Sequence, residues 1–114
     1  YPWGDTFISA NLNYSGNGNF DTVPVDGSPE DVSAFGVYSL AGNVSEWVSD
    51  RYQEDWYTVT DQAVDPTGPL SGNYYVIRGG SAQTGENTAR TADRFYALNT
   101  SYSLDRGFRC AFTD

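Results

Sequence analysis

Glu46 is the side chain whose setting most directly suggests chemistry, because the surrounding stretch Gly42–Asp50 has the alternation of a half-buried strand. Such a strand directs Glu46 to the same face as Val44 and Val48. Burial of an ionised carboxylate without a cation or several donors costs several kcal/mol. The sequence therefore predicts that an arginine or a metal ion lies against Glu46. A carboxylate half in water at the end of the strand is the alternative.

Nucleophiles and soft metal ligands are scarce in this chain. It has one Cys and no His, which excludes an intrachain disulfide and removes the commonest zinc ligand and general base. Cys110 falls on the apolar face of a predicted closing strand and is interpreted as a buried structural thiol. Asp93 and Glu86 are a conceivable acid–base pair, but 15 acidic residues in 114 produce such pairs by chance. We therefore predict no catalysis by these groups.

The charge balance excludes several classes of partner. Six basic and 15 acidic residues give a net charge of 6 − 15 = −9, which disfavours binding to nucleic acids and to anionic membranes. No apolar run approaches the roughly 20 residues that span a bilayer, so no membrane insertion is predicted. No targeting segment opens the chain, and localisation stays open, with an extracellular or surface-displayed protein as one alternative.

Loops dominate the predicted organisation of what should be one domain with one core. Tyr1–Asp31 is rich in turn formers, and no helix longer than about two turns is indicated. The predicted fold class is α+β, mostly β and irregular, with long loops and little helix. The segments considered are strands at Gly42–Asp50, Asn73–Arg78 and Phe108–Phe112, a strand or helical turn at Thr88–Phe95, and a loop at Tyr96–Asp105.

Four ordered motifs resemble those of the formylglycine-generating enzyme (sulfatase-modifying factor) family. They are Gly42-Asn43-Val44-Ser45-Glu46-Trp47, Arg78-Gly79-Gly80-Ser81, Arg90-Thr91-Ala92-Asp93-Arg94 and Gly107-Phe108-Arg109-Cys110. The resemblance implies a C-type-lectin-like fold, with residues 1–114 as a single domain that corresponds to the C-terminal portion of the family's domain. That family includes oxygen-using enzymes and also the non-catalytic variable proteins of diversity-generating retroelements.

The resemblance also shows which catalytic ligands this chain lacks. Family enzymes that use copper hold it with a pair of cysteines, one of which falls on Thr91, and Gly85–Arg90 supplies no partner cysteine. A hydroxyl does not replace a soft sulfur ligand. Members that use iron rely on histidines, which are absent here. We therefore expect no enzyme activity and no copper, haem or nucleotide cofactor.

Two calcium sites of the family can be placed on this sequence by its motifs. One would use Ser39, the carbonyls of Gly42 and Val44, and Glu46, a set of oxygen ligands that suits calcium. The weaker second site falls on Asn11, Leu12, Asn17 and Asn19, where Asn17 replaces an acidic ligand. A structural calcium ion is therefore expected. From the residues alone, local Asx turns explain the run Asn11–Asn19 better than a cation does.

Four of the six basic residues fall inside the motifs, which predicts a scaffold role for them. Arg78, Arg90, Arg94 and Arg109 are expected to pair with acids or to donate to backbone carbonyls.

The leading functional hypothesis is a non-catalytic ligand-binding module that displays variable surface loops on this scaffold. Small residues at Ser45 and Ala82 replace aromatic residues of the family pattern, and nearby segments have a Tyr, Ser, Asn and Thr composition typical of binding loops. The partner would be a protein or another surface ligand. The alternatives are a fragment of a formylglycine-generating enzyme or related oxidoreductase, and a structural accessory domain of a surface protein. The predicted binding residues, on one exposed face, are Ser45, Ala82, Thr84, Asn87, Tyr96, Asn99, Ser101 and Tyr102.

Overall fold

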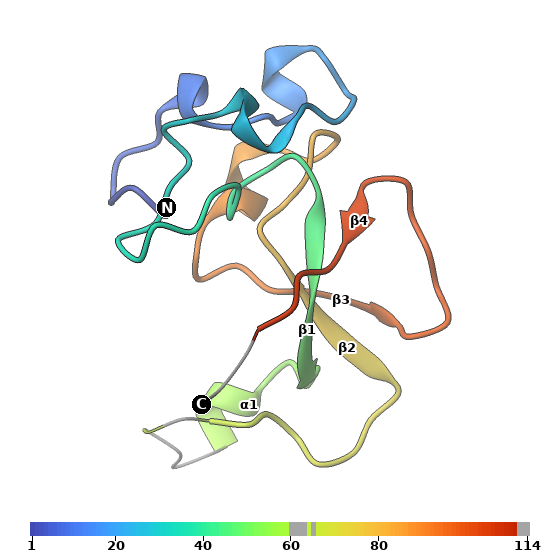
Figure 1. The fold of residues 1–114 in the computed structure, drawn as a ribbon. Helices are drawn as coiled ribbons and strands as arrows, with labels where there is room; N and C mark the ends of the chain where they lie inside the picture. Colours follow the sequence, from blue (N-terminus) through green and yellow to red (C-terminus); the bar gives the residue numbers. More distant parts are fainter. Residues whose placement is uncertain (60–63, 65, 112–114) are drawn as a thin grey trace.

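The computed structural model describes residues 1–59, 64 and 66–111 (Figure 1). Four strands form one sheet in the order β3-β2-β1-β4, in which the β1–β2 and β2–β3 pairs are antiparallel and β4 is parallel to β1. The strands are β1 (Ser45–Arg51), β2 (Tyr74–Arg78), β3 (Phe95–Leu98) and β4 (Arg106–Gly107). The helices are α1 (Trp56–Val59) and the 3-10 turns η1 (Ser9–Asn11), η2 (Ser15–Asn17), η3 (Val25–Gly27) and η4 (Glu86–Ala89).

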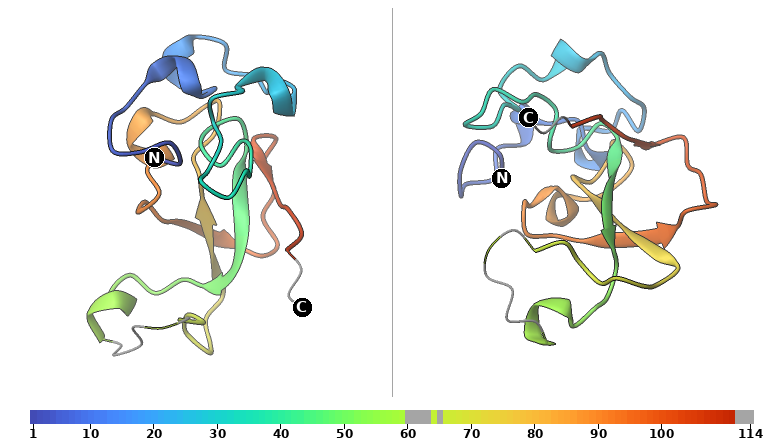
Figure 2. Two further views of the ribbon diagram at one scale, coloured as in Figure 1. Left: turned by 60° about the vertical axis from the view of Figure 1, so that its left-hand side comes forward. Right: turned by 60° about the horizontal axis from the view of Figure 1, so that its bottom comes forward.

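The N-terminal segment covers one end of the sheet, and α1 lies beyond the other end. Both turned views in Figure 2 keep this arrangement. One cluster of the described core contains Leu12, Ala41 and Ala89, with Trp3 and Phe7 among the aromatic side chains packed against it. The other buried hydrophobic residues are Val76, Ile77 and Ala82. In the part of the chain that the structure describes, no helix has the length and apolar character needed to cross a bilayer. One small sheet surrounded by long loops and short helical turns confirms the predicted fold class.

The turn before β1 joins the N-terminal segment to the sheet. Gly42 (φ 73°) and Asn43 (φ 61°) both have left-handed backbones, and a Cβ on Gly42 would lie 2.2 Å from the Asn13 carbonyl oxygen. The Asn43 backbone N–H donates to that oxygen at 2.7 Å. Its side-chain Oδ1 accepts from the Val23 N–H at 2.9 Å, and its Nδ2 donates to the Val23 carbonyl at 3.1 Å. These two motif residues therefore have a structural role.

Strand β1 has the predicted alternation over its first residues, before a register shift between Trp47 and Arg51. Trp47 pairs with Ile77 of β2, and the neighbouring Glu46 pairs with Arg78 on the opposite face. Ser45 and Glu46 lie beside Arg106 and Gly107 of β4. The strands predicted at Gly42–Asp50 and Asn73–Arg78 are therefore confirmed.

Two predictions for the C-terminal third are wrong. The Tyr96–Asp105 segment, expected to be a loop, begins inside β3, whose Phe95 and Tyr96 pair with Ile77 and Val76. The closing strand is only Arg106–Gly107, and residues 108–111 lie outside any strand and are exposed, Phe108 to 76%. Cys110 is therefore not the expected buried thiol, because no strand pairing covers this segment. Phe112 lies outside the described residues.

Candidate functional site

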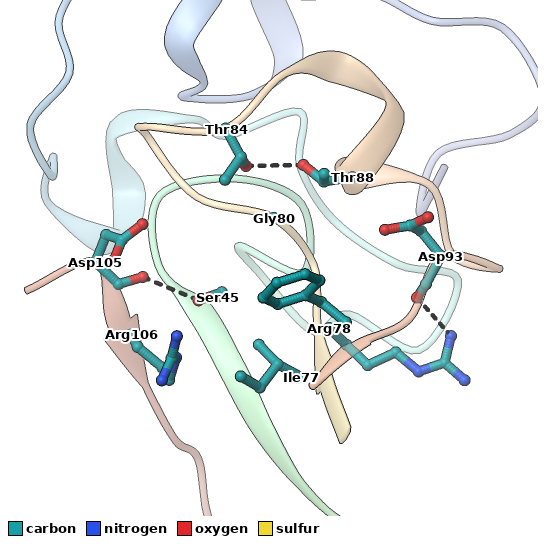
Figure 3. A pocket seen from close by; sticks show the side chains of 10 residues that line it. Ser45, Ile77, Arg78, Gly80, Thr84, Thr88, Asp93, Asp105 and Arg106 are labelled. Atoms are coloured by element: carbon teal, nitrogen blue, oxygen red, sulfur yellow. Dashed lines mark hydrogen bonds between the residues drawn. The ribbon is translucent and has the colours of Figure 1, made fainter. Parts of the chain in front are cut away.

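A pocket of about 170 Å³ opens where β1, β2, β3 and β4 meet the loops that follow β2 and precede β4 (Figure 3). Its floor is apolar: Ile77 and Phe95 lie directly opposite each other in the β2–β3 pair and face the same side. The residues that line it are Ser45, Ile77, Arg78, Gly80, Thr84, Thr88, Asp93, Phe95, Asp105 and Arg106.

One rim of the pocket is a pair of threonines that are held by internal hydrogen bonds. The Thr88 hydroxyl is 2.7 Å from the Thr84 hydroxyl and 2.7 Å from the Gly85 carbonyl, and Thr84 Oγ1 accepts from the Ser81 N–H at 2.8 Å. Gly80 has φ 69°, and a Cβ there would lie 2.7 Å from Thr88 Oγ1. The second glycine of the Arg-Gly-Gly-Ser motif thus allows the threonine loop to approach the strand.

Asp105 fixes the wall beside β4. Its carboxylate accepts hydrogen bonds from Ser81 Oγ at 2.6 Å and from the Ser103 hydroxyl, and its carbonyl accepts from the Ser45 N–H at 2.8 Å and from Ser45 Oγ at 3.1 Å. Burial alone would raise the pKa of Asp105, but the two hydroxyl donors, a backbone hydrogen bond and the charge of Arg106 bring this pKa below its usual value. The carboxylate is therefore ionised at neutral pH, and each of its oxygens accepts a hydrogen bond.

Arg106 occupies the same side of the pocket as Asp105 (Figure 3). Its guanidinium lies over the Trp47 ring, 5.1 Å from the centroid, and Nη1 donates to the Ser101 hydroxyl at 3.2 Å. Its Nε has no exposed surface and no hydrogen-bond partner among the described residues. The sequence analysis missed both Asp105 and Arg106, since neither belongs to a motif.

The predicted binding residues divide into three groups. Asn87, Asn99, Ser101 and Tyr102 are exposed, Tyr102 to 92%. Ser45 and Thr84 are half-buried and line the pocket. Ala82 and Tyr96 do not lie on the pocket surface.

The placement of Ala82 on the surface was wrong. This residue is 1% exposed, and its N–H donates to the Asn43 carbonyl at 2.9 Å. The small side chain belongs to the packing beneath the loop and is inaccessible to a ligand.

Tyr96 is exposed and does not line the pocket. Its ring lies against that of Phe95, with centroids 5.5 Å apart. The Tyr96 ring stacks on Tyr52, with centroids 4.3 Å apart, and meets Tyr74 edge-on at 5.1 Å. Phe95, rather than Tyr96, lines the pocket. A strand predicted over these residues would have indicated this choice.

The partner of Glu46 is Arg109, one of the two alternatives that the sequence left open. Arg109 Nε donates to Glu46 Oε2 at 2.7 Å, and Nη2 donates to the other carboxylate oxygen. The guanidinium also donates to the carbonyls of Tyr38 at 2.9 Å and Ser39 at 2.8 Å. Glu46 and its hydrogen bonding hold the pKa of Arg109 above its usual value, against the effect of burial. The site is thus already neutralised by a side chain.

This pairing bears on the calcium site placed at Ser39, Gly42, Val44 and Glu46. Both Glu46 oxygens and the Ser39 carbonyl are bound to Arg109, and the Ser39 hydroxyl donates to the Val25 carbonyl at 3.1 Å. Ligation of calcium by Glu46 would require the guanidinium to withdraw. The donor set therefore does not fit the ion while the pair is intact.

At the second calcium site, the side chains of Asn17 and Asn19 are engaged in internal hydrogen bonds. Asn17 Oδ1 accepts from the Tyr14 N–H at 3.0 Å, and Asn17 Nδ2 donates to the Ser9 carbonyl at 3.3 Å. Asn19 Nδ2 donates to the Asp21 carbonyl at 2.9 Å. Asn11 ends η1, and the neighbouring Leu12 is part of the buried core. The bond from the Tyr14 N–H to Asn17 Oδ1 caps η2.

The contacts expected of the motif arginines, to acids or backbone carbonyls, are confirmed. Arg78 donates to the carbonyls of Thr91 at 2.8 Å and Asp93 at 3.0 Å. Arg94 donates to the carbonyls at positions 53 and 54, at 3.2 and 3.0 Å, and its guanidinium lies over two tyrosine rings. Arg90 forms an exposed ion pair with Asp93 at 3.6 Å.

A catalytic metal ion in the described part of the chain would need side chains that could together hold it. No group there brings together three or more His, Cys, Asp or Glu side chains in a metal-binding arrangement. Thr91, at the position where the resemblance expects a copper thiolate, is exposed, and its carbonyl accepts the hydrogen bond from Arg78.

Comparison with known proteins defines the class. Residues 1–113 match the model of the sulfatase-modifying factor enzyme 1-like domain, and the chain belongs to this family. It is 35% identical to the formylglycine-generating enzyme of Thermomonospora curvata, over 97% of this chain and 42% of that protein. It is 36% identical to the serine/threonine-protein kinase pkn1 of Chlamydia caviae, over 97% of this chain but 17% of that protein. The chain thus spans less than half the length of either relative.

Among solved structures, the fold matches Treponema denticola variable protein 1 with a TM-score of 0.74. The sequences are 26% identical, and the match covers 94% of this chain and 39% of that one. The C-type-lectin-like fold implied by the motifs is thus confirmed, and the likeness extends to a variable protein as well as to enzymes of the family.

Proposed function

We propose that this chain is a non-catalytic ligand-binding module that presents adaptable loops around the pocket on a rigid sheet. The observation that carries the proposal is the pocket itself, with its apolar floor of Ile77 and Phe95 beneath a rim whose hydroxyls are already hydrogen-bonded. Such a site is preorganised, so little ordering accompanies binding. The exposed Asn, Ser and Tyr side chains beside it provide adaptable hydrogen bonding and contact area.

The likeness to a variable protein supports this proposal and extends it. We infer that the chain is diversified by a retroelement, as the variable proteins that it resembles are. Exposed positions on loops tolerate substitution with changes in stability usually within about 0.5 kcal/mol, which makes diversity there inexpensive. A near-copy of the 3′ coding segment that differs at adenines would be expected near the gene.

A selected peptide provides the test of the binding surface. Peptides selected on the parent protein from a random phage-displayed library should lose at least tenfold in affinity for a variant with Ala at Asn87, Asn99, Ser101 and Tyr102, while its melting temperature stays nearly unchanged. The matched control carries Ala at four exposed positions of the N-terminal segment, Asp5, Thr22, Asp26 and Glu30. Equal affinity for the parent and both variants would place binding elsewhere and refute the proposal.

The enzymatic relatives favour one competing function, formylglycine generation. We expect no oxidation of a cysteine-containing sulfatase peptide by this chain with copper supplied, because Thr91 offers no thiolate and the sequence has one cysteine. The measurement is peptide mass before and after incubation, with an active formylglycine-generating enzyme as the positive control. Turnover above background would overturn the non-catalytic proposal.

A further inference from the structure

Arg106 differs from the other arginines in how its charge is satisfied. Arg109 and Arg90 are paired with carboxylates, and the remaining three donate to backbone carbonyls: Arg51, Arg78 and Arg94. The only hydrogen bond that the guanidinium of Arg106 makes within the described residues is to the hydroxyl of Ser101. A guanidinium has five N–H donors, so most of its hydrogen-bonding capacity is unused at the pocket wall.

The nearest acid does not supply the missing partner. Asp105 lies on the same wall, but its two carboxylate oxygens accept from Ser81 and Ser103. No carboxylate of the described residues comes within ion-pair distance of Arg106. The stack on Trp47 holds the guanidinium in place. The wall therefore presents a fixed cation with unused donors, which is the arrangement that favours a carboxylate ligand.

The volume of the pocket and its apolar floor limit the size and polarity of the group attached to the ligand carboxylate. Ile77 and Phe95 make this part apolar, and the volume is about 170 Å³. An apolar cavity of about 150 Å³ accepts benzene. A phenyl group therefore matches both the size and the polarity of the floor.

We propose that the pocket binds a carboxylate joined to a phenyl-sized apolar group, as at the C-terminus of a polypeptide that ends in an aromatic residue. The ring lies on Ile77 and Phe95, and the carboxylate accepts from the terminal nitrogens of Arg106. This inference rests on the proposed binding function and specifies the ligand of that same site.

Titration of the full chain with N-acetyl-phenylalanine tests this chemistry. Two-dimensional amide NMR spectra measure the binding. We expect saturable shifts at Ser45, Phe95 and Arg106. N-acetyl-phenylalanine amide should bind at least tenfold more weakly, because it loses charge-assisted hydrogen bonds. N-acetylglycine, which lacks the ring, should also bind at least tenfold more weakly. A short peptide that ends in phenylalanine, if it binds more tightly than the single residue, identifies a polypeptide terminus as the source. Equal binding of acid and amide, or shifts confined to other regions, would overturn the inference.

Variants assign the effect to Arg106. Arg106→Gln should abolish the preference for acid over amide, and Arg106→Lys should retain part of it because the charge remains. Arg51→Gln removes the same charge at a residue that does not line the pocket, and its preference should be unchanged. A preserved preference in Arg106→Gln would refute the role of this residue. If all carboxylates fail to bind while selected peptides still depend on the exposed loop residues, the ligand chemistry is wrong but the proposed function stands.

Discussion

Two arginines, three residues apart in the sequence, meet opposite sides of strand β1 and are used in opposite ways. Arg109 reaches Glu46 on one face, where it makes four hydrogen bonds to a carboxylate and two carbonyls. Arg106 lies on the other face over Trp47, with a single hydrogen bond to a hydroxyl. On the side of β1 that carries Glu46, here called the closed face, every guanidinium nitrogen of Arg109 has an internal partner. On the other side, most donors of the Arg106 guanidinium have no partner among the described residues.

The difference shows what the family motifs encode. Arg109, Glu46 and the Gly42-Asn43 turn all belong to motifs, and all of their described contacts are internal. Arg106 and Phe95 lie just outside motifs and line the pocket. The motifs thus supply internal contacts of the scaffold and part of the pocket lining, such as Ser45 and Gly80, while Phe95 and Arg106 are added from outside them.

The largest expected effect on stability comes from removing the guanidinium of Arg109 from the closed face. Arg109→Ala leaves the half-buried Glu46 carboxylate and two carbonyls without donors, so we expect a loss of about 2 to 3 kcal/mol in the free energy of unfolding. Arg106→Gln, which removes the cation of the other face, should cost less than about 1 kcal/mol. Urea denaturation of both variants measures the contrast, and equal losses would show that the two faces do not differ as described.

A smaller effect is expected from Asp31, which also belongs to the closed face. This residue is 0% exposed, Oδ2 accepts from the Ala41 N–H at 2.9 Å, and Oδ1 has no partner in the described structure. Burial raises the pKa of Asp31 to about 6, and backbone hydrogen bonds and the charge of Arg109 oppose the rise only in part. Because the pKa is raised in the folded state, the associated stability is fully present below pH 3.8 and is lost as the pH rises through about 6.

Asp31→Asn tests this pH dependence, because the amide keeps an acceptor for Ala41 and does not titrate. Relative to the parent, the variant should gain about 1 kcal/mol in unfolding free energy between pH 5 and pH 7.5. Chemical denaturation at the two pH values measures the gain, and comparing the two proteins cancels the titration of the other acids. A constant difference between variant and parent would show that Asp31 has an ordinary pKa.

The smallest effect is expected from removal of calcium. Because Arg109 already neutralises Glu46, a chelator should change the melting temperature of the parent by less than the error of the measurement. If calcium holds Glu46 instead, a saturating ion would contribute on the order of 2 to 3 kcal/mol, and the chelator would lower the melting temperature by several degrees. That outcome would show that calcium, rather than Arg109, neutralises Glu46.

The sequence predicted the parts of the fold that depend on local pattern. Alternation around Glu46 and the β-branched run in Asn73–Arg78 indicated β1 and β2, and the need of Glu46 for a cation was correctly inferred. The strand at Phe95–Leu98 was missed because its pairing with β2 depends on tertiary contacts, and its sequence neighbours are polar.

The site was harder to predict than the scaffold, for the same reason. The exposure of Ala82 was inferred from the loss of an aromatic residue at that position, whereas a small side chain fits equally well beneath a loop. The roles of Asp105 and Arg106 arise only when β4 lies beside β1. No spacing in the sequence brings Ser45 and Ser81 to the same aspartate.

The Asn43 turn joins the loop after β2 to the N-terminal segment through hydrogen bonds. The same residue accepts from the Ala82 N–H through its carbonyl, donates to the Asn13 carbonyl and holds Val23 with its side chain. Opening the N-terminal segment therefore releases the start of the loop that carries Thr84. In hydrogen-exchange terms, we expect the amides of Val23, Asn43 and Ala82 to open together. The order of the pocket rim would then depend on a segment that does not line the pocket.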